Sequence, residues 1–334
     1  MTGHEASEET ASTGGFETSG TNTTFLGLDV GATTVRAVIG SGDGTILANI
    51  ARPTPDGSPE AFASEVRVLL QDVCAAAAVE PSSVVAAGIG SMGPLDRPAG
   101  VAVDPPNLAL DRVPLVDPVE DVLDADLHLY NDATAAAIGE RFVREPDVAN
   151  LVYLTVSTGI GAGAIVDGKP VVGATGNAVE AGHFVLDRRG PALCGCGGTG
   201  HWEGYASGAN LPDYARHLAH ADGLETALDL EALDARTIYE ATDPLAETVR
   251  ERAVGWHAQG VSILVRAFDP DLVAIGGSVA VENRSAVVSA VCDRLPALLG
   301  DSPPRVELTA LGDAGGAMGA LACAITGGTG ERHR

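Results

Sequence analysis

The segment FLGLDVGATTVRAVIGSGDGTILANIA, residues 25–51, decides the fold that the sequence predicts, because it holds three short β-forming runs. Glycine-rich breaks separate these runs, which cover residues 25–30, 34–40 and 45–51. Small residues at such breaks are typical of tight turns between antiparallel strands. The segment therefore predicts a three-stranded β-meander.

Beyond the meander, strand-like and helical patterns alternate, and the whole series then begins again. In the first series, residues 59–79 and 132–143 have helical spacing, and the strand-like runs are 84–90 and 127–131. The second series has strand-like runs at 151–156, 161–168, 272–277 and 305–311, and helical patterns at 244–268, 284–299 and 313–325. Two meanders, each followed by α/β alternation, predict two similar α/β domains around a central cleft.

The composition also indicates where the domains begin and end. Residues 1–24 are acidic and polar, so we expect a disordered N-terminal tail there. A polar stretch at 144–147 indicates a boundary, which gives an N-terminal domain at 25–146 and a C-terminal domain at 147–326. We expect the last helix, 313–325, to pack back on the N-terminal domain, and residues 327–334 to form a second disordered tail.

The chain is strongly acidic, with 45 Asp and Glu residues against 20 Lys and Arg residues and a formal net charge of −25. Such a surface repels phosphate backbones, which argues against nucleic-acid binding. The acidic residues are spread along the chain, so we favour adaptation to a cytoplasm of molar salt, where the Debye length is about 3 Å. Recruitment of a basic partner by an acidic face is the alternative.

Cysteine use and hydropathy indicate the compartment. The 5 cysteines are an odd number and do not resemble a disulfide framework. No apolar run approaches the roughly 18 residues that span a bilayer, and the N-terminus lacks the basic and apolar regions of a signal peptide. We therefore expect a cytoplasmic protein that does not bind membranes.

Two glycine-rich turns have the composition of phosphate-binding hairpins. In the first, Asp29 ends a strand, and the turn that follows consists of Gly31, Ala32, Thr33 and Thr34. Backbone N–H groups and threonine hydroxyls can bind a phosphate there, while Asp29 can hold Mg²⁺ through water. An ordinary hairpin is the alternative interpretation.

The second half of the chain repeats this device between two strands, with a turn made of Thr158, Gly159, Ile160 and Gly161. Glycine at alternate positions lets the backbone approach a ligand closely. Gly276 and Gly277, which follow a later strand, would form a glycine-floored surface for a flat adenosine. Each feature alone is weak, but together they favour a nucleotide polyphosphate bound between two hairpins.

Asn131 and Asp132 stand where a predicted strand runs into a predicted helix. Asp132 is a candidate general base, because ligands of α/β proteins bind at the carboxyl ends of strands. A helix cap explains the same residue at least as well. The local sequence leaves both interpretations open.

The segment from residue 180 to residue 203 is rich in candidate metal ligands. His183, Cys194, Cys196 and His201 offer two imidazoles and two thiolates, which is a plausible tetrahedral Zn²⁺ set. Glu180 and Glu203 flank them. The alternative is a glycine-rich surface loop with unrelated cysteines, which so close a grouping makes the weaker interpretation.

Taken in order, these motifs resemble those of the ROK family of sugar kinases and repressors. The resemblance covers residues 25 to about 326, and its most specific parts are Asp29–Thr34, Asn131-Asp132-Ala133, Thr158–Gly161, Glu180-x-Gly-His183 and Cys194-x-Cys196. Two further segments match, Ser91-Met92-Gly93-Pro94 and Pro106-Asn107-Leu108, although Met92 replaces a usual proline. His201 stands where the family usually has a third cysteine, and Ala162 replaces a usual glycine.

The resemblance implies an actin-like, hexokinase-like (ribonuclease H-like) fold of two α/β domains. It implies that Asp132 is the catalytic base and that the sugar is bound by Gly93, Asn107, Asn131, Asp132, Glu180, His183 and Glu203. The expected activity is an ATP- and Mg²⁺-dependent hexose kinase, with glucose as the best single substrate and a homodimer as the expected assembly. The alternatives are a kinase for fructose, mannose or an N-acetylhexosamine, and a non-catalytic sugar sensor.

Overall fold

The computed structural model describes residues 23–105, 108–144, 148–300, 302–312 and 315–331. The expected N-terminal tail lies almost entirely outside these ranges, as do residues 145–147 of the expected domain boundary and the candidate sugar ligand Asn107. Within the described ranges, no helix is both long and apolar enough to cross a membrane.

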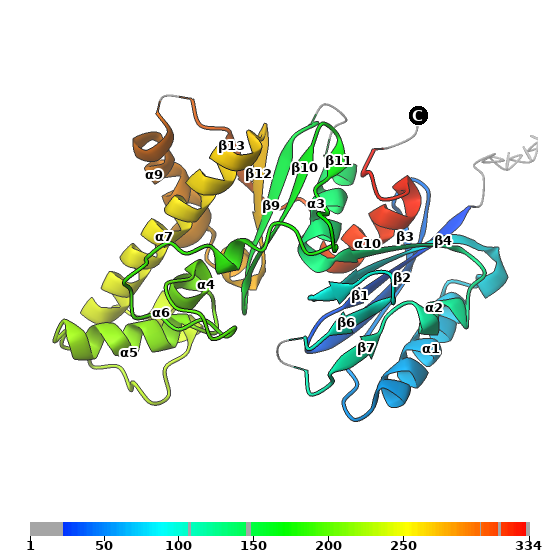
Figure 1. Cartoon of the computed structure of the whole chain (residues 1–334), viewed down its shortest axis with the longest axis horizontal. Coiled ribbons are helices and arrows are strands. Elements are labelled where there is room, and N and C mark those ends of the chain that lie inside the picture. The colour runs from blue at the N-terminus through cyan, green and yellow to red at the C-terminus, as the bar shows by residue number, and fades with distance from the viewer. Residues whose placement is uncertain (1–22, 106–107, 145–147, 301, 313–314, 332–334) are drawn as a thin grey trace, which may run out of the picture.

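Two five-stranded sheets form the two halves of the molecule, and they have the same strand order (Figure 1). The first has the order β3-β2-β1-β4-β8, with β1 Thr24–Val30, β2 Thr34–Ser41, β3 Ile46–Pro53, β4 Val84–Ser91 and β8 Asp126–Asn131. The second has the order β11-β10-β9-β12-β13, with β9 Leu151–Val156, β10 Ile160–Val166, β11 Lys169–Pro170, β12 Leu272–Gly276 and β13 Arg305–Leu308. In each sheet an antiparallel meander is extended by parallel strands, as the sequence predicts.

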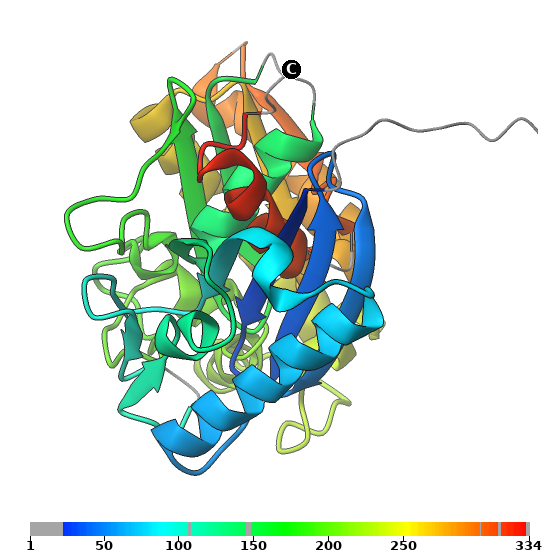
Figure 2. The same ribbon diagram turned by 90° about the vertical axis from the view of Figure 1, so that its right-hand side faces the viewer.

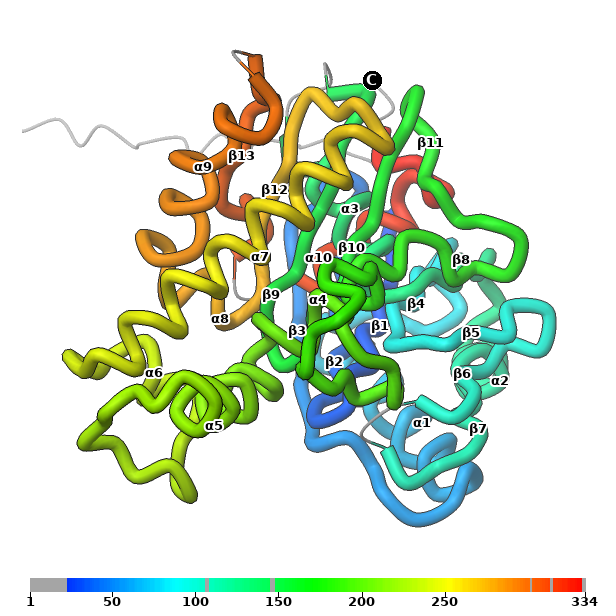
Figure 3. Tube along the Cα trace, turned by 60° about the vertical axis from the view of Figure 1, so that its left-hand side comes forward, coloured from blue at the N-terminus to red at the C-terminus, as the bar shows by residue number. Residues whose placement is uncertain are grey.

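Helices cover the outer faces of both sheets. The helix α1, Pro59–Ala76, runs across the first sheet (Figure 2) and buries Phe62, Val66, Leu69, Leu70 and Val73, which recur at helical spacing. Ser58 caps it by accepting a hydrogen bond from Ala61 N. On the second sheet, α7 (Pro244–Phe268) lies beside α9 (Ala290–Leu299), which a π-helical segment at Ser285–Ser289 precedes (Figure 3).

Two helices lie between the sheets, and each packs on the half that it does not follow in the chain (Figure 1). The helix α3, Asp132–Val143, follows β8 but packs on β9 and β10. The helix α10, Gly315–Thr326, follows the second sheet but packs on β1 and β4. A Cβ atom at Gly88 would lie 1.9 Å from Ala320 O, and one at Gly163 would lie 2.3 Å from Ala133 O, so glycine is required for both contacts.

Several elements were not predicted. A small third sheet consists of β5 Leu95–Asp96, β6 Val101–Val103 and β7 Arg112–Pro114, and α2 (Asp117–Glu120) follows it. Between β11 and β12 the chain adds the short helices α4 Trp202–Ala206, α5 Leu211–Ala221 and α6 Ala235–Glu240, and α8 Ser278–Glu282 follows β12. Strands of two or three residues are too short to show a recognisable alternation.

The segment after α10 differs from the expected disordered tail. Residues 327–331 are described, and Thr329 O accepts a hydrogen bond of 2.6 Å from the Arg141 guanidinium. The same guanidinium donates to Gly168 O at 2.9 Å. Because Arg141 is buried, it needs these carbonyl partners, and the segment is ordered by supplying one of them.

Candidate active site and metal cluster

Asp132 lies at the point where β8 ends and α3 begins. Ala133 N donates to Asn131 Oδ1 at 3.0 Å and to Asp132 Oδ1 at 2.7 Å, and Asn131 is the N-cap residue of α3. The Asp132 side chain is open to solvent, yet the surrounding protein removes enough hydration to raise its pKa above the ordinary value. An accessible carboxylate with a raised pKa is suited to accept a proton from a bound ligand.

Asp29, at the end of β1, lies near Asp132 in space. Burial and, to a lesser extent, the negative charge of Asp132 raise the pKa of Asp29 to about 7, against the opposing charge of Arg36. The first turn of α10 covers this carboxylate, because a Cβ atom at Gly316 would lie 2.2 Å from Asp29 Oδ2. Two carboxylates that repel each other are suited to a divalent cation, which removes the repulsion.

The first candidate phosphate hairpin connects β1 to β2. Gly31 N donates to Thr34 O at 3.0 Å and closes the turn. Thr54, just beyond β3, holds it from the side, because its hydroxyl donates to Gly31 O at 2.7 Å and its N–H donates to Thr33 O at 3.0 Å. Neutral hydrogen bonds therefore fix this hairpin and leave the Thr33 side chain exposed.

The second candidate hairpin connects β9 to β10 at the equivalent place in the second sheet. Ser157 N donates to Gly159 O at 2.9 Å, and Ile160 N donates to the Glu203 carboxylate at 2.9 Å. Ile160 thus begins β10 rather than lying within the turn.

Gly276 and Gly277, the predicted adenosine floor, have structural reasons to be glycine. A Cβ atom at Gly276 would lie 2.4 Å from the Tyr153 hydroxyl oxygen. Gly277 has a φ of +89° and abuts Val156 O, where a Cβ atom would lie at 2.4 Å. Its left-handed backbone carries the chain from β12 into α8, close to the second hairpin.

The candidate sugar ligands come from both halves of the chain. The pKa of Glu180 is raised mainly by loss of hydration; the charge of His183 lowers it, and the charges of Asp132 and Glu203 raise it. Gly93 lies beside Asn131, since a Cβ atom there would lie 3.5 Å from Asn131 Nδ2. Asp132, Glu180 and His183 have exposed side chains, so a ligand can reach them.

The four candidate metal ligands converge. The ligand atoms of His183, Cys194, Cys196 and His201 all lie within 4.8 Å of one another. Cys194 Sγ is 3.6 Å from His183 Nδ1, and Cys196 Sγ is 3.3 Å from His201 Nδ1. Zn²⁺ binds thiolates at about 2.3 Å and imidazoles at about 2.0–2.1 Å, so such edge lengths suit a tetrahedron around one ion.

Burial raises the pKa of the Cys194 thiol, so a bound cation would have to stabilise its thiolate. His183 faces Cys194 with Nδ1, which leaves Nε2 for another partner. This donor set fits a structural Zn²⁺ ion that fixes the loop from His183 to His201.

Two residues near the site were missed by sequence reasoning. Asn177 joins the halves, because Leu95 N donates to its Oδ1 at 2.7 Å and its Nδ2 donates to Leu95 O at 3.0 Å. Val179, directly before Glu180, has a φ of +64°, which is a strained conformation for a β-branched residue. Neither residue has a local sequence signal. The Asn177 contact spans 82 positions of the chain.

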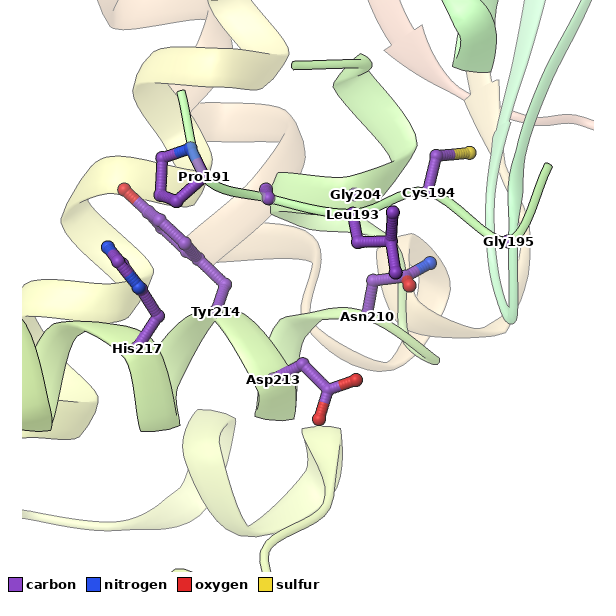
Figure 4. A pocket seen from close by; sticks show the side chains of 10 residues that line it. Pro191, Leu193, Cys194, Gly195, Gly204, Asn210, Asp213, Tyr214 and His217 are labelled. Atoms are coloured by element: carbon purple, nitrogen blue, oxygen red, sulfur yellow. The ribbon is translucent and has the colours of Figure 1, made fainter. Parts of the chain in front are cut away.

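A cavity of about 240 Å³ lies behind the metal loop (Figure 4). It is lined by the chain around Cys194 and Gly204 and by Asp213, Tyr214 and His217 of α5. Among its lining residues only Cys194 is a candidate site residue, and none is a candidate sugar or nucleotide ligand. The candidate sugar and nucleotide ligands therefore lie outside this cavity.

Comparisons with known proteins identify the family of this chain. The sequence profile of the ROK family matches residues 25–326. The glucokinase of Pyrobaculum calidifontis is 36% identical over 302 residues, covering 90% of this chain and 94% of the relative. An N-acetylmannosamine kinase of Escherichia coli is 34% identical over 280 residues, covering 82% of this chain and 90% of the relative.

Among solved structures, the ROK family glucokinase of Streptomyces griseus in complex with glucose and AMPPNP is similar, with a TM-score of 0.73 and 28% identity. The match covers 90% of this chain and 99% of that chain. The chain therefore belongs to the ROK family and has its two-domain, actin-like α/β fold.

Proposed function

We propose that this protein is an ATP-dependent hexose kinase that transfers a phosphoryl group to glucose. The position of Asp132 carries the proposal, because its charge acts both on Asp29, the candidate metal acid, and on Glu180, a candidate sugar ligand. A base that lies between a metal site and a sugar site can accept the proton of the sugar hydroxyl during phosphoryl transfer from nucleotide to sugar.

Phosphoryl transfer depends on positioning and on neutralising charge more than on covalent chemistry. When bound, Mg²⁺ supplies charge neutralisation at the phosphates, and Asp29 would hold it through water. The hairpins at Gly31–Thr34 and Thr158–Gly161 would hold the phosphates, and Gly276 and Gly277 would lie under the adenosine. Asp132 accepts the proton of the attacking sugar hydroxyl.

The sugar would be held by Asn131, Glu180, His183 and Glu203, with Gly93 beside Asn131 and Asn107 as a further ligand. Carboxylates suit sugars because each can accept two or more hydroxyl hydrogen bonds. A Zn²⁺ ion on His183, Cys194, Cys196 and His201 would fix the loop that carries His183 and leads into Glu203. The free Nε2 of His183 would then face the sugar.

A kinase for another sugar is the second candidate, and the identity to an N-acetylmannosamine kinase favours it over a non-catalytic sensor. The sensor has no need of Asp132, Asp29 and two hairpins. A coupled assay with ATP and a panel of glucose, mannose, fructose, N-acetylglucosamine and N-acetylmannosamine, run in molar KCl, separates the candidates. A preference for an N-acetylated sugar would replace glucose, and no turnover with any sugar would favour the sensor.

We propose that this enzyme works in a salt-rich cytoplasm and that it forms a homodimer. All 5 cysteines are free, which suits a reducing compartment. Reducing KCl from molar to about 0.1 M lengthens the Debye length from about 3 to 10 Å, so repulsion within the acidic chain grows. Thermal melts at both concentrations test this, and an equal melting temperature would contradict salt adaptation.

A further inference from the structure

The Glu203 carboxylate faces the candidate sugar site and also accepts hydrogen bonds from the protein. It lies in the first turn of α4, and its Oε2 accepts a hydrogen bond of 2.9 Å from Ile160 N in the second hairpin. A Cβ atom at Gly159 would lie 2.7 Å from the same oxygen, and one at Gly182 would lie 3.3 Å from it. The carboxylate is therefore packed against the backbone of the hairpin.

The segment that carries Glu203 is itself anchored on both sides. Trp202 is fully buried, and its Nε1 donates to His257 Nδ1 of α7 at 3.3 Å. Beyond α4, Gly208 N donates to Ser157 O at 2.8 Å and Ala209 N donates to Thr158 O at 3.0 Å. One short segment, residues 203–209, thus holds the hairpin from Ser157 to Ile160 at three points.

The other oxygen of Glu203 faces away from the hairpin. Its Oε1 lies 3.4 Å from Cys194 Sγ, on the side of the metal loop and of Glu180. The two oxygens of one carboxylate therefore face two different candidate sites. Glu180 differs, because its side chain makes no hydrogen bond to the hairpin among the residues that the structure describes.

We propose that Glu203 positions the second phosphate hairpin and thereby couples sugar binding to nucleotide binding. This rests on the proposed kinase function and adds a second role for a residue implied to bind sugar. A sugar that binds Glu203 would restrict the carboxylate, and the restricted carboxylate would hold Ile160 N and the hairpin in the phosphate-binding conformation. Bound sugar would thus tighten nucleotide binding. Thermodynamic linkage then requires bound nucleotide to tighten sugar binding by the same factor, typically about 5- to 150-fold.

Isosteric variants isolate this role. Glu203→Met removes the acceptor of Ile160 N, whereas Glu203→Gln keeps an oxygen for it and has nearly the same volume. Both variants lose the carboxylate offered to the sugar. Glu180→Gln is the matched control, because it removes a neighbouring carboxylate that does not contact the hairpin.

The decisive measurement is calorimetric binding of AMPPNP with Mg²⁺ in molar KCl and without sugar. We expect Glu203→Met to weaken binding about fivefold, the usual effect of losing one hydrogen bond, while Glu203→Gln and Glu180→Gln stay within twofold of wild type. Equal affinity in all four proteins would overturn the proposal and leave Glu203 as a sugar ligand only. Failure of the wild type to bind AMPPNP would instead overturn the kinase function, and the proposal with it.

Amide hydrogen exchange in the wild type gives a test that does not depend on the folding of a variant. The proposal requires glucose to slow exchange at Ile160 N, the amide bonded to Glu203. Unchanged exchange at saturating glucose, with glucose binding verified by calorimetry, would contradict the coupling. Melting temperature and zinc content of each variant show whether a loss of affinity comes from unfolding or loss of metal.

Discussion

The two candidate phosphate hairpins occupy equivalent places in two sheets of the same strand order, but different groups hold them. The hairpin between β1 and β2 is fixed by the neutral side chain and backbone of Thr54. The hairpin between β9 and β10 is fixed by the Glu203 carboxylate and by the chain that follows it. A repeated fold has thus supplied a hairpin at the same place in each sheet, with different chemistry added beside each copy.

The difference extends to the whole site. The first half contributes Asp29 and Asp132, the two acids that the mechanism places at the reacting phosphate. The second half contributes the Glu180, His183 and Glu203 group and the metal cluster, which come from the segment inserted between β11 and β12. In the proposed mechanism, the first half therefore supplies the acids at the reacting phosphate, and the second supplies the charged sugar ligands.

The strongest way to break this division is to exchange one carboxylate in each half for an amide. We expect Asp132→Asn to lower kcat by at least about 10²–10⁴-fold, because it removes the base, while glucose binding by calorimetry largely persists. Glu180→Gln should instead raise the glucose KM more than it lowers kcat. Near wild-type turnover in Asp132→Asn would mean that the residue serves only the start of α3.

Variants of the candidate metal ligands test whether the second half acts by binding the sugar. Cys194→Ser should release the zinc and raise the glucose KM by about 10-fold or more, the lower end of effects reported for disturbed metal shells. His201→Cys should be tolerated and should raise zinc affinity, because a third thiolate adds negative charge. Metal analysis of protein purified without chelator checks both, and full activity with no zinc would contradict the structural role.

Asp29 in the first half should give a pH dependence that Mg²⁺ shifts. Because its pKa is raised to about 7, kcat/KM at low Mg²⁺ should fall up to tenfold per pH unit as pH drops below about 7. Higher Mg²⁺ should move this limb to lower pH, since metal and proton compete for one carboxylate. A limb that does not respond to Mg²⁺ would remove Asp29 from the metal site.

The same raised pKa has the opposite effect on stability. The folded state binds the Asp29 proton more tightly than the unfolded chain does, so this group stabilises the fold fully only below about pH 4 and loses that contribution as pH rises to about 7. Asp29→Asn should therefore raise the melting temperature more at pH 8 than at pH 5. The exposed Asp56→Asn is the control and should shift neither value.

The smallest expected effect concerns the first hairpin. Thr54→Val removes the neutral hydrogen bond to Gly31 O, which is worth about 1 kcal/mol, or roughly a fivefold change. We expect the ATP KM to rise by no more than that factor, and by less than in Glu203→Met. A larger rise in Thr54→Val would mean that the neutral contacts matter more than the carboxylate, and the comparison would be reversed.

Much of the site could be predicted from local sequence. Asp29, Asp132 and the two glycine-rich turns stand at strand ends, and the periodicity of the flanking runs locates those ends. The convergence of His183, Cys194, Cys196 and His201 could also be predicted, because all four lie within 19 residues of chain, counting from 183 to 201. The local sequence could not decide whether Asp132 is a cap or a base.

By itself, the sequence determined the two meanders, their α/β continuations and the positions of the glycines, because strand and helix periods and turn residues act over a few positions. Only the tertiary structure decided that α3 and α10 each pack on the opposite half, and that Glu203 reaches Ile160 across 43 positions. It also decided that Asn131 is the N-cap of α3, so that Asp132 is the next residue, open to solvent and close to Asp29. Such contacts depend on how whole elements pack, and no local pattern records that packing.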